Sequence, residues 1–128
     1  MWQLFSENSP YKKKARFAAI LWTLLIFILC FLPGNDIPDI NIPLADKWAH
    51  MVLFGAFSFL WLCASPTKSI TYAFILLVIT IFVGWLVEYI QGHYIPGRAQ
   101  DSMDTLADSV GGLLGIILFH LLARIGAK

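Results

Sequence analysis

The chain has 128 residues, enough for one domain covering residues 1–128, and 59% of its residues are hydrophobic whereas 13% are charged. Soluble domains are typically about 45–50% apolar and about 25% charged, so the composition excludes an ordinary soluble domain and indicates an integral membrane protein. The formal net charge is +1, and no basic patch lies outside the flanks of the apolar segments. We therefore expect no nucleic-acid partner.

The first apolar segment follows a short polar lead. Residues Met1–Arg16 end in the sequence YKKKAR, and Phe17–Leu32 carry no charge. Basic residues before an apolar run can mark a signal peptide, but no small-residue cleavage site follows, and Pro33-Gly34 ends the run. The pattern therefore predicts an uncleaved membrane span over residues 17–32.

Three longer apolar segments follow. A proline-containing loop over residues 35–45 leads to the second segment, and a tight turn over 65–69 separates it from the third. The loop from Gln91 to Ser102 contains Pro96-Gly97 and precedes the fourth. The predicted spans are residues 46–65, 70–89 and 104–123. Each would be about 30 Å long as a helix, which matches the hydrocarbon core of a bilayer.

The basic residues predict the orientation of these spans. Four spans place both termini on one side of the membrane. If that side is inside, the inner segments hold seven of the nine Lys and Arg residues, namely Lys12, Lys13, Lys14, Arg16, Lys68, Arg124 and Lys128. Cytoplasmic segments of membrane proteins are enriched in Lys and Arg. We therefore predict an all-α bundle of four transmembrane helices with both termini cytoplasmic.

Ionisable residues gather at the outer ends of the last three spans. Asp46 and His50 lie one helical turn apart at the start of the second span, and Asp104 and Asp108 do the same in the fourth. The remaining members of the predicted polar layer are Lys47, Glu88, Gln91, Arg98 and Asp101. Charge at the edge of a bilayer is costly and usually marks a working site. The layer is therefore the predicted ligand-binding pocket.

Structural roles compete with binding at each position. Asp101 and Asp104 can cap the helix that begins near them. Asp108 lies past the first turn and needs a partner, which Arg98 or Lys47 could supply. Glu88 and Lys47 can snorkel to the membrane surface. His50 can be a satisfied packing histidine or an acid/base group beside Asp46.

Small residues continue the polar stripe of the last span. Gly111 and Gly115 follow Asp108 in a G-x-x-x-G spacing, which lets two membrane helices approach closely. Asp104, Asp108 and both glycines share one helical face, so we expect that face to point into the bundle. Cys30 and Cys63 lie inside apolar runs and are expected to be buried free thiols.

The polar residues form an ordered set of motifs. These are D-K-x-x-H at Asp46, Lys47 and His50, E-x-x-Q at Glu88 and Gln91, R-x-x-D-x-x-D at Arg98, Asp101 and Asp104, and then Gly111 and Gly115. This set resembles the VanZ-like family of small membrane proteins. The resemblance implies a multi-pass protein of the bacterial inner membrane, of a family named for a protein linked to low-level teicoplanin resistance. The chain departs from the family at Asp108, where an asparagine is usual.

Four functions are compatible with the sequence. The preferred one is a bacterial envelope protein whose outer-leaflet pocket binds the polar head group of a lipid-linked cell-wall precursor, an anionic lipid or a lipoglycopeptide, with Lys47 and Arg98 contacting phosphate or carboxylate. The alternative is a membrane enzyme acting on a lipid-linked substrate. In that case Glu88, Asp104 and Asp108 could hold a divalent cation, although no cofactor motif is evident. A transporter subunit that acts as an oligomer and a purely structural polar knot complete the set.

Overall fold

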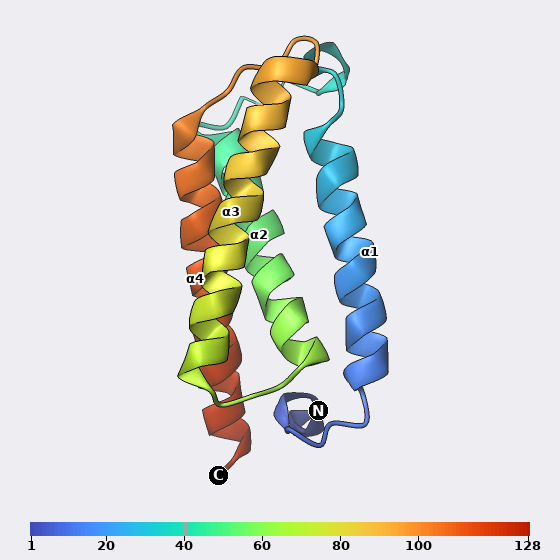
Figure 1. Cartoon of the computed structure of the whole chain (residues 1–128), viewed down its shortest axis with the longest axis vertical. Coiled ribbons are helices and arrows are strands. Elements are labelled where there is room, and N and C mark those ends of the chain that lie inside the picture. Colours follow the sequence, from blue (N-terminus) through green and yellow to red (C-terminus); the bar gives the residue numbers. More distant parts are fainter. Residues whose placement is uncertain (40) are drawn as a thin grey trace.

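The computed structural model describes residues 1–39 and 41–128, and every regular element within them is helical. Four long helices run side by side along the long axis of the molecule: α1 (Lys12–Cys30), α2 (Ala45–Ala64), α3 (Ile70–Tyr94) and α4 (Ser102–Gly126) (Figure 1). Two short 3₁₀ turns, η1 (Trp2–Phe5) and η2 (Gly34–Asp36), precede α1 and α2 respectively. Residue 40 of the predicted loop over 35–45 lies outside the described residues.

Three of these helices are long and apolar enough to cross a membrane, namely α2, α3 and α4. The helix α1 is not among them, because its first turns carry three lysines and Arg16. Its charge-free part begins at Phe17, and the helix ends at Cys30, two residues before the predicted end of the first span. The four predicted apolar segments are thus four helices, of which three meet the criteria for a membrane span.

The predicted loop after the third span begins too early. Helix α3 continues to Tyr94, five residues past the predicted end of that span, and includes Gln91. The buried Gln91 amide finds a partner on a neighbouring helix, where its Nε2 donates to the Cys30 carbonyl at 2.7 Å. The last helical residue is Tyr94, and Ile95 is extended, because proline disfavours helical backbone in the residue that precedes it.

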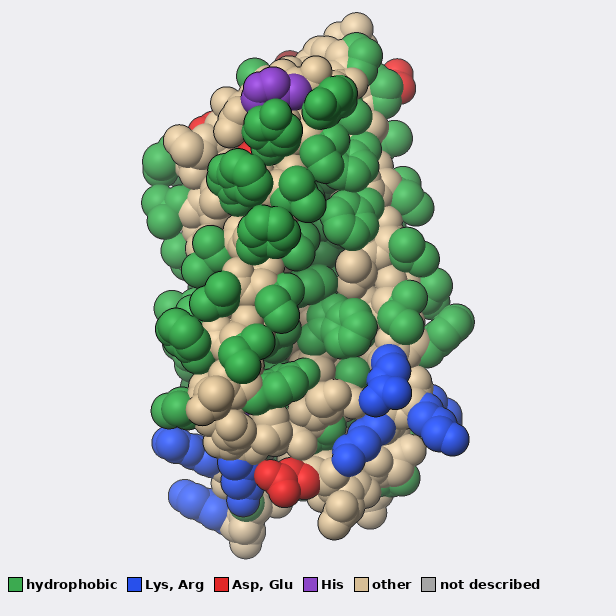
Figure 2. All heavy atoms as spheres, in the orientation of Figure 1, with side chains coloured by type: hydrophobic (Ala, Val, Ile, Leu, Met, Phe, Trp, Pro, Cys, Tyr) green, Lys and Arg blue, Asp and Glu red, His purple; other side chains and the backbone are tan. Residues whose placement is uncertain are grey.

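The outer surface of the bundle is apolar and its two ends are polar. Large hydrophobic side chains such as Phe17, Val52, Phe74, Leu114 and Leu118 are exposed along the helices. In Figure 2 they form a broad band around the middle of the visible face, and Lys and Arg gather below it. An exposed apolar surface of this extent suits contact with lipid rather than water.

Glycines bring α2 and α4 close together. A Cβ atom built on Gly111 would lie 2.7 Å from the Cα atom of Met51, and one built on Gly115 would overlap the carbonyl oxygen of Gly55. Only a residue without a side chain fits at such a backbone-to-backbone approach. The contact is closed by Ser58, whose hydroxyl donates to the Gly112 carbonyl at 2.8 Å. This approach fixes the relative height of the polar residues on α2 and α4.

Both termini lie at the same end of the bundle, the lower end in Figure 1. A side chain on Gly126 of α4 would meet the ring of Trp2 in η1, so the first and last turns of the chain are in contact. The opposite end carries the α1–α2 and α3–α4 connections. Gly34 and Gly97 meet there, and the Gly34 N–H donates to the Pro96 carbonyl at 2.9 Å. The two connections therefore support each other above the polar ends of the helices.

Candidate functional site

The polar residues of α2, α3 and α4 meet at the end of the bundle opposite the termini. They come from the first turns of α2 and α4 and from the last turns of α3. We describe them in two parts: a rim of Asp46, Lys47, Asp101 and Asp104, and a buried cluster of His50, Glu88 and Asp108. The close approach of α2 and α4 puts the two parts at successive depths.

The rim is organised around one ammonium group. Lys47 Nζ lies 2.8 Å from Asp46 Oδ2, 2.6 Å from Asp101 Oδ2 and 2.5 Å from Asp104 Oδ1. All three hydrogens of the ammonium therefore have carboxylate acceptors. The side chains of Asp46 and Asp101 are 61% and 43% exposed, whereas that of Asp104 is 12% exposed. The rim is thus a charged surface that opens to solvent at Asp46 and Asp101.

Asp101 has two structural roles in this rim. Its Oδ1 accepts the N–H of Met103 and caps α4, as one of the alternatives predicted. Its Oδ2 accepts from Lys47, and this hydrogen bond holds the pKa of the Asp101 carboxyl below its usual range. Asp101 is therefore ionised at neutral pH.

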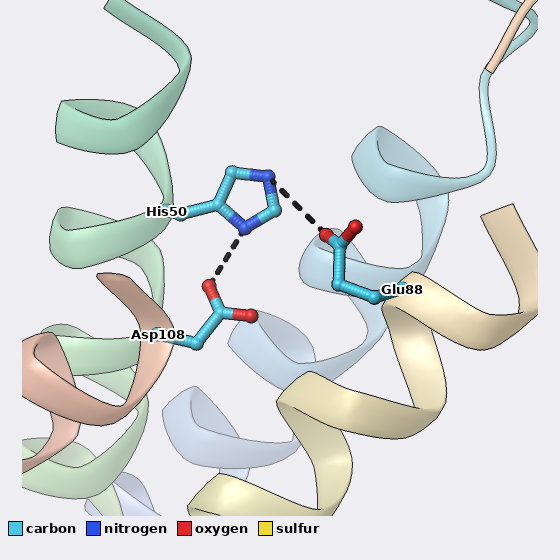
Figure 3. Close-up of side chains that lie close together, drawn as sticks. All are labelled: His50, Glu88 and Asp108. Atoms are coloured by element: carbon cyan, nitrogen blue, oxygen red, sulfur yellow. Dashed lines mark hydrogen bonds and ion pairs between the residues drawn. The ribbon is translucent and has the colours of Figure 1, made fainter. Parts of the chain in front are cut away.

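The buried cluster is organised around His50 (Figure 3). His50 Nδ1 lies 2.7 Å from Asp108 Oδ1. When the Asp108 carboxyl is ionised it can only accept, and Nδ1 is then the donor of this hydrogen bond. The other ring nitrogen, Nε2, lies 4.0 Å from Glu88 Oε1 and 3.7 Å from Asp104 Oδ2. These two separations are too long for hydrogen bonds.

Two carboxylate oxygens in this cluster have no hydrogen-bond partner. They are Glu88 Oε1 and Asp108 Oδ2, and both residues are fully buried. The second oxygen of Glu88, Oε2, accepts the backbone N–H of Asp101 at 3.1 Å. Buried carboxylates are costly unless they are paired, hydrogen-bonded or bound to a metal. The cluster is therefore short of positive charge or donors.

Some predicted partners differ in the structure. Asp108 pairs with His50 rather than with Arg98 or Lys47, and Asp46 pairs with Lys47 rather than with His50. The prediction for His50 relied on the spacing within one helix, whereas the close approach of α2 and α4 brings the Asp108 carboxylate within hydrogen-bonding distance of His50 Nδ1. Glu88 does not snorkel, because it is fully buried.

Arg98 and Gln91 join the layer to α1. Arg98 Nε donates to the Leu32 carbonyl at 3.1 Å, and a terminal nitrogen donates to the Leu29 carbonyl at 3.2 Å. Gln91 donates to the Cys30 carbonyl. These carbonyls belong to the last turn of α1 and the residues just after it, where the helix itself provides no donors. The structure therefore uses Arg98 and Gln91 to hold the end of α1 and does not bring Arg98 into contact with the carboxylates.

One residue that makes room for the cluster escaped the sequence analysis. A Cβ atom on Gly84 of α3 would lie 2.8 Å from Asp108 Oδ2 and 2.9 Å from Asp108 Cβ, so only glycine leaves space for that carboxylate. Gly84 precedes Glu88 by one helical turn and so lies on the same face of the helix, and this spacing is the sequence feature that could have identified it.

Two sets of side chains have the spacing of metal ligands. One is His50, Glu88 and Asp108, and the other is Asp46, Asp101 and Asp104. In the second set the carboxylates already surround the Lys47 ammonium. The first set has an imidazole and unpartnered carboxylate oxygens.

One comparison with known proteins identifies a family for this chain. A family model described as VanZ/LLP1 matches residues 2–123, which is nearly the whole chain. No curated protein and no solved structure matches the chain.

Proposed function

The chain belongs to the VanZ/LLP1 family, as its motifs predicted, and from this premise we propose that it binds the polar head group of an amphiphile at the outer face of the bacterial inner membrane. The head group belongs to a lipid-linked cell-wall precursor or to a glycopeptide-type molecule. A role in teicoplanin tolerance and in the cell envelope is part of the proposal. The polar layer of rim and buried cluster is the binding site.

The proposed topology has four spans with both termini in the cytoplasm. Its support is the distribution of charge. Figure 2 shows Lys and Arg side chains gathered at the end of the bundle that holds the termini, and Lys68 and Arg124 lie beside the penultimate residue Ala127. The helix α1 is the proposed fourth span. Its first turn lies at the level of these basic residues, and its last carbonyls are bonded to Gln91 and Arg98 beside the polar layer. With 19 residues α1 is one residue shorter than α2, and its lysines can reach the inner surface.

The observation that carries the proposal is the surplus of negative charge in the layer. Five carboxylates, those of Asp46, Glu88, Asp101, Asp104 and Asp108, surround Lys47 and His50. All three Lys47 hydrogens are already engaged, so that ammonium is not free to hold a phosphate directly. The surplus instead favours a head group rich in hydroxyl or ammonium donors, such as a sugar or an amino sugar.

The position of the layer favours an amphiphile over a soluble ligand. The rim lies where the apolar band of the bundle ends, and Trp48 and Tyr94 are exposed at this end. Exposed aromatic residues at the ends of membrane helices sit at the level of lipid head groups. A molecule with its tail in the bilayer would therefore present its head group at the height of the rim.

Native mass spectrometry of the protein extracted from its own membrane tests this function. We expect a bound amphiphile in the wild-type protein and its loss from an Asp46→Asn, Asp101→Asn variant, which removes the two exposed negative charges of the rim. Arg98→Gln is the matched control, since Arg98 lies in the same connection but contacts α1, and it should retain the amphiphile. Wild-type protein free of any amphiphile, or a rim variant with wild-type occupancy, would contradict the proposal.

The second candidate is a membrane enzyme acting on a lipid-linked substrate. The observation in its favour is that Asp108 fixes Nδ1 of His50 and leaves Nε2 free on the side of Glu88 and Asp104. An imidazole oriented in this way can act as a general base. Turnover of a lipid-linked substrate that is lost in His50→Gln would support the enzyme. Retained binding without turnover would favour the binding protein.

A further inference from the structure

We propose that His50, Glu88 and Asp104 hold one divalent transition-metal ion, and that Asp108 orients His50 toward it. The proposal rests on the proposed function for the use of the ion, which would lie directly beneath the rim and would supply a positive charge for an oxygen of the head group. The site itself is argued from the coordinates of α2, α3 and α4 alone.

The first argument is the distance between the atoms that would bind the ion. His50 Nε2 is 4.0 Å from Glu88 Oε1 and 3.7 Å from Asp104 Oδ2. Bonds from zinc to nitrogen or oxygen ligands are about 2.0–2.2 Å long, so two ligands of one ion lie up to about 4 Å apart. Both separations are longer than hydrogen bonds and short enough for an ion to lie between His50 Nε2 and each carboxylate oxygen. Asp104 therefore adjoins the set of His50, Glu88 and Asp108 named above, in which the ligand atoms lie within 4.8 Å of one another.

The second argument is that each of the three groups is held in place by a hydrogen bond. In each group the atom that makes this bond is the second oxygen or nitrogen, not the one that would bind the ion. The opposite oxygen of Glu88 accepts the Asp101 N–H, and the opposite oxygen of Asp104 accepts from Lys47. The opposite nitrogen of His50 donates to Asp108. Metal-ligating histidines almost always donate their second N–H to such an acceptor, which fixes the tautomer with the free lone pair toward the ion.

The third argument is independent of the spacing. Glu88 Oε1 is fully buried, has no hydrogen-bond partner and points toward His50 Nε2 (Figure 3). An anionic oxygen in that position requires a proton or a cation. A divalent cation satisfies Glu88, Asp104 and the His50 lone pair at once, whereas a single proton satisfies one of them.

The donor set favours one class of ion. Imidazole nitrogen suits zinc, iron and other transition metals, whereas magnesium and calcium prefer an all-oxygen shell. One imidazole and two carboxylates are therefore expected to bind Zn²⁺ or Mn²⁺ in preference to Mg²⁺. The partial exposure of Asp104 leaves a side of the site open toward the rim.

The test measures metal binding by the full-length protein in detergent after removal of metal with a chelator. Titration with Zn²⁺ and Mn²⁺, read by elemental analysis and by the unfolding temperature, should give one ion per chain and a higher unfolding temperature, with much weaker binding of Mg²⁺. Glu88→Gln and His50→Gln should lose the ion. Asp46→Asn is the matched control and should keep it, because the Asp46 carboxylate pairs with Lys47 and is not one of the proposed ligands.

Asp108 is a positioning residue in this site, and a pair of variants separates that role from simple packing. Asp108→Ala should weaken metal binding by about 10- to 100-fold, as is typical when the partner of a ligating histidine is removed. Asp108→Asn should restore most of it, because the amide oxygen still accepts the Nδ1–H. Equal affinity in Asp108→Ala and wild type would overturn the orienting role.

A measurement on wild-type protein keeps the proposal testable if a variant fails to fold. Co²⁺ added to the metal-free protein should give a visible absorption spectrum typical of nitrogen and oxygen ligands, and Zn²⁺ should abolish it. Folded wild-type protein that binds neither ion stoichiometrically would overturn the metal site. The metal titration needs no amphiphile. A protein that binds metal but carries no amphiphile from its own membrane would therefore count against the proposed function alone. A bound amphiphile without metal would count against the metal site alone.

Discussion

His50 Nδ1 of α2 lies 2.7 Å from Asp108 Oδ1 of α4, and both side chains are buried. This contact joins the two most closely packed helices at the depth of the buried cluster. It gives the single N–H of a neutral imidazole an acceptor, and it gives one of the two oxygens of a fully buried carboxylate a donor. Its removal should therefore affect stability as well as binding.

Asp108→Ala should lower the free energy of unfolding by about 1–3 kcal/mol, the usual cost of a buried donor left without a partner. Asp108→Asn should lower it less, because its carbonyl oxygen can still accept from His50. Thermal unfolding in detergent, followed by the intrinsic fluorescence of the tryptophans, measures the difference. An alanine variant as stable as the asparagine variant would show that the pair does not hold the helices.

Gly111→Ala should destabilise the protein in a way that no side-chain change repairs. The new methyl group would meet the backbone of Met51, and overpacking of this kind costs about 1–3 kcal/mol. Gly112→Ala would instead meet Thr80 Cγ2, 2.6 Å away. Thr80→Ser removes that methyl group and keeps the hydroxyl that donates to the Leu76 carbonyl.

The comparison of the two glycines is a rescue experiment. The unfolding temperature of Gly112→Ala should recover when Thr80→Ser is added, and that of Gly111→Ala should not. Recovery in both double variants would mean that α2 and α4 are farther apart than the structure places them.

The rim should contribute to stability in a pH-dependent way through Asp101. The pKa of its carboxyl is held below its usual range by Lys47, so its contribution is complete above the unfolded-state pKa of about 4. The contribution is lost as the pH falls through the lower folded-state pKa. In Lys47→Gln, a ¹³C NMR titration should show the Asp101 midpoint at a higher pH than in wild type. An unchanged midpoint would remove Lys47 as the cause.

The proposed topology predicts which connections face the outside. In a background that replaces the buried thiols of Cys30 and Cys63 with alanine, a membrane-impermeant thiol reagent should label Asn35→Cys in intact spheroplasts. It should label Ser69→Cys, in the α2–α3 turn, only after lysis. The reverse pattern would place the polar layer on the cytoplasmic side and reject the proposed location.

The sequence predicted the helices and the height of the polar layer well, because both depend on local patterns. Asp46 and His50 on one helix, and Asp104 and Asp108 on another that starts at the same end, have the same helical spacing. Asp46 and Asp104 therefore lie together in the rim, and His50 and Asp108 lie together one turn deeper. The family assignment from these motifs is confirmed by the match over residues 2–123.

The partners within the layer were harder to predict, because they depend on which helices touch. Spacing within one helix suggested that Asp46 accompanies His50, but the glycines of α4 bring Asp108 nearer. Arg98 lies in a connection whose path is set by Gly34 against Gly97, and its engagement with α1 carbonyls leaves no sequence pattern. Helix α3 continues past the predicted end of the third span and includes Gln91, whose hydrogen bond to the Cys30 carbonyl is a tertiary contact that periodicity does not reveal.

The most direct test of the account replaces the charge of the layer while keeping its shape. The triple variant Glu88→Gln, Asp104→Asn, Asp108→Asn conserves side-chain volume, and replacing buried charge in this way often leaves a protein folded. Native mass spectrometry should then find folded variant protein without the amphiphile that accompanies the wild type. The same amphiphile on the folded variant at wild-type occupancy would mean that the layer only holds the helices together and does not bind a head group.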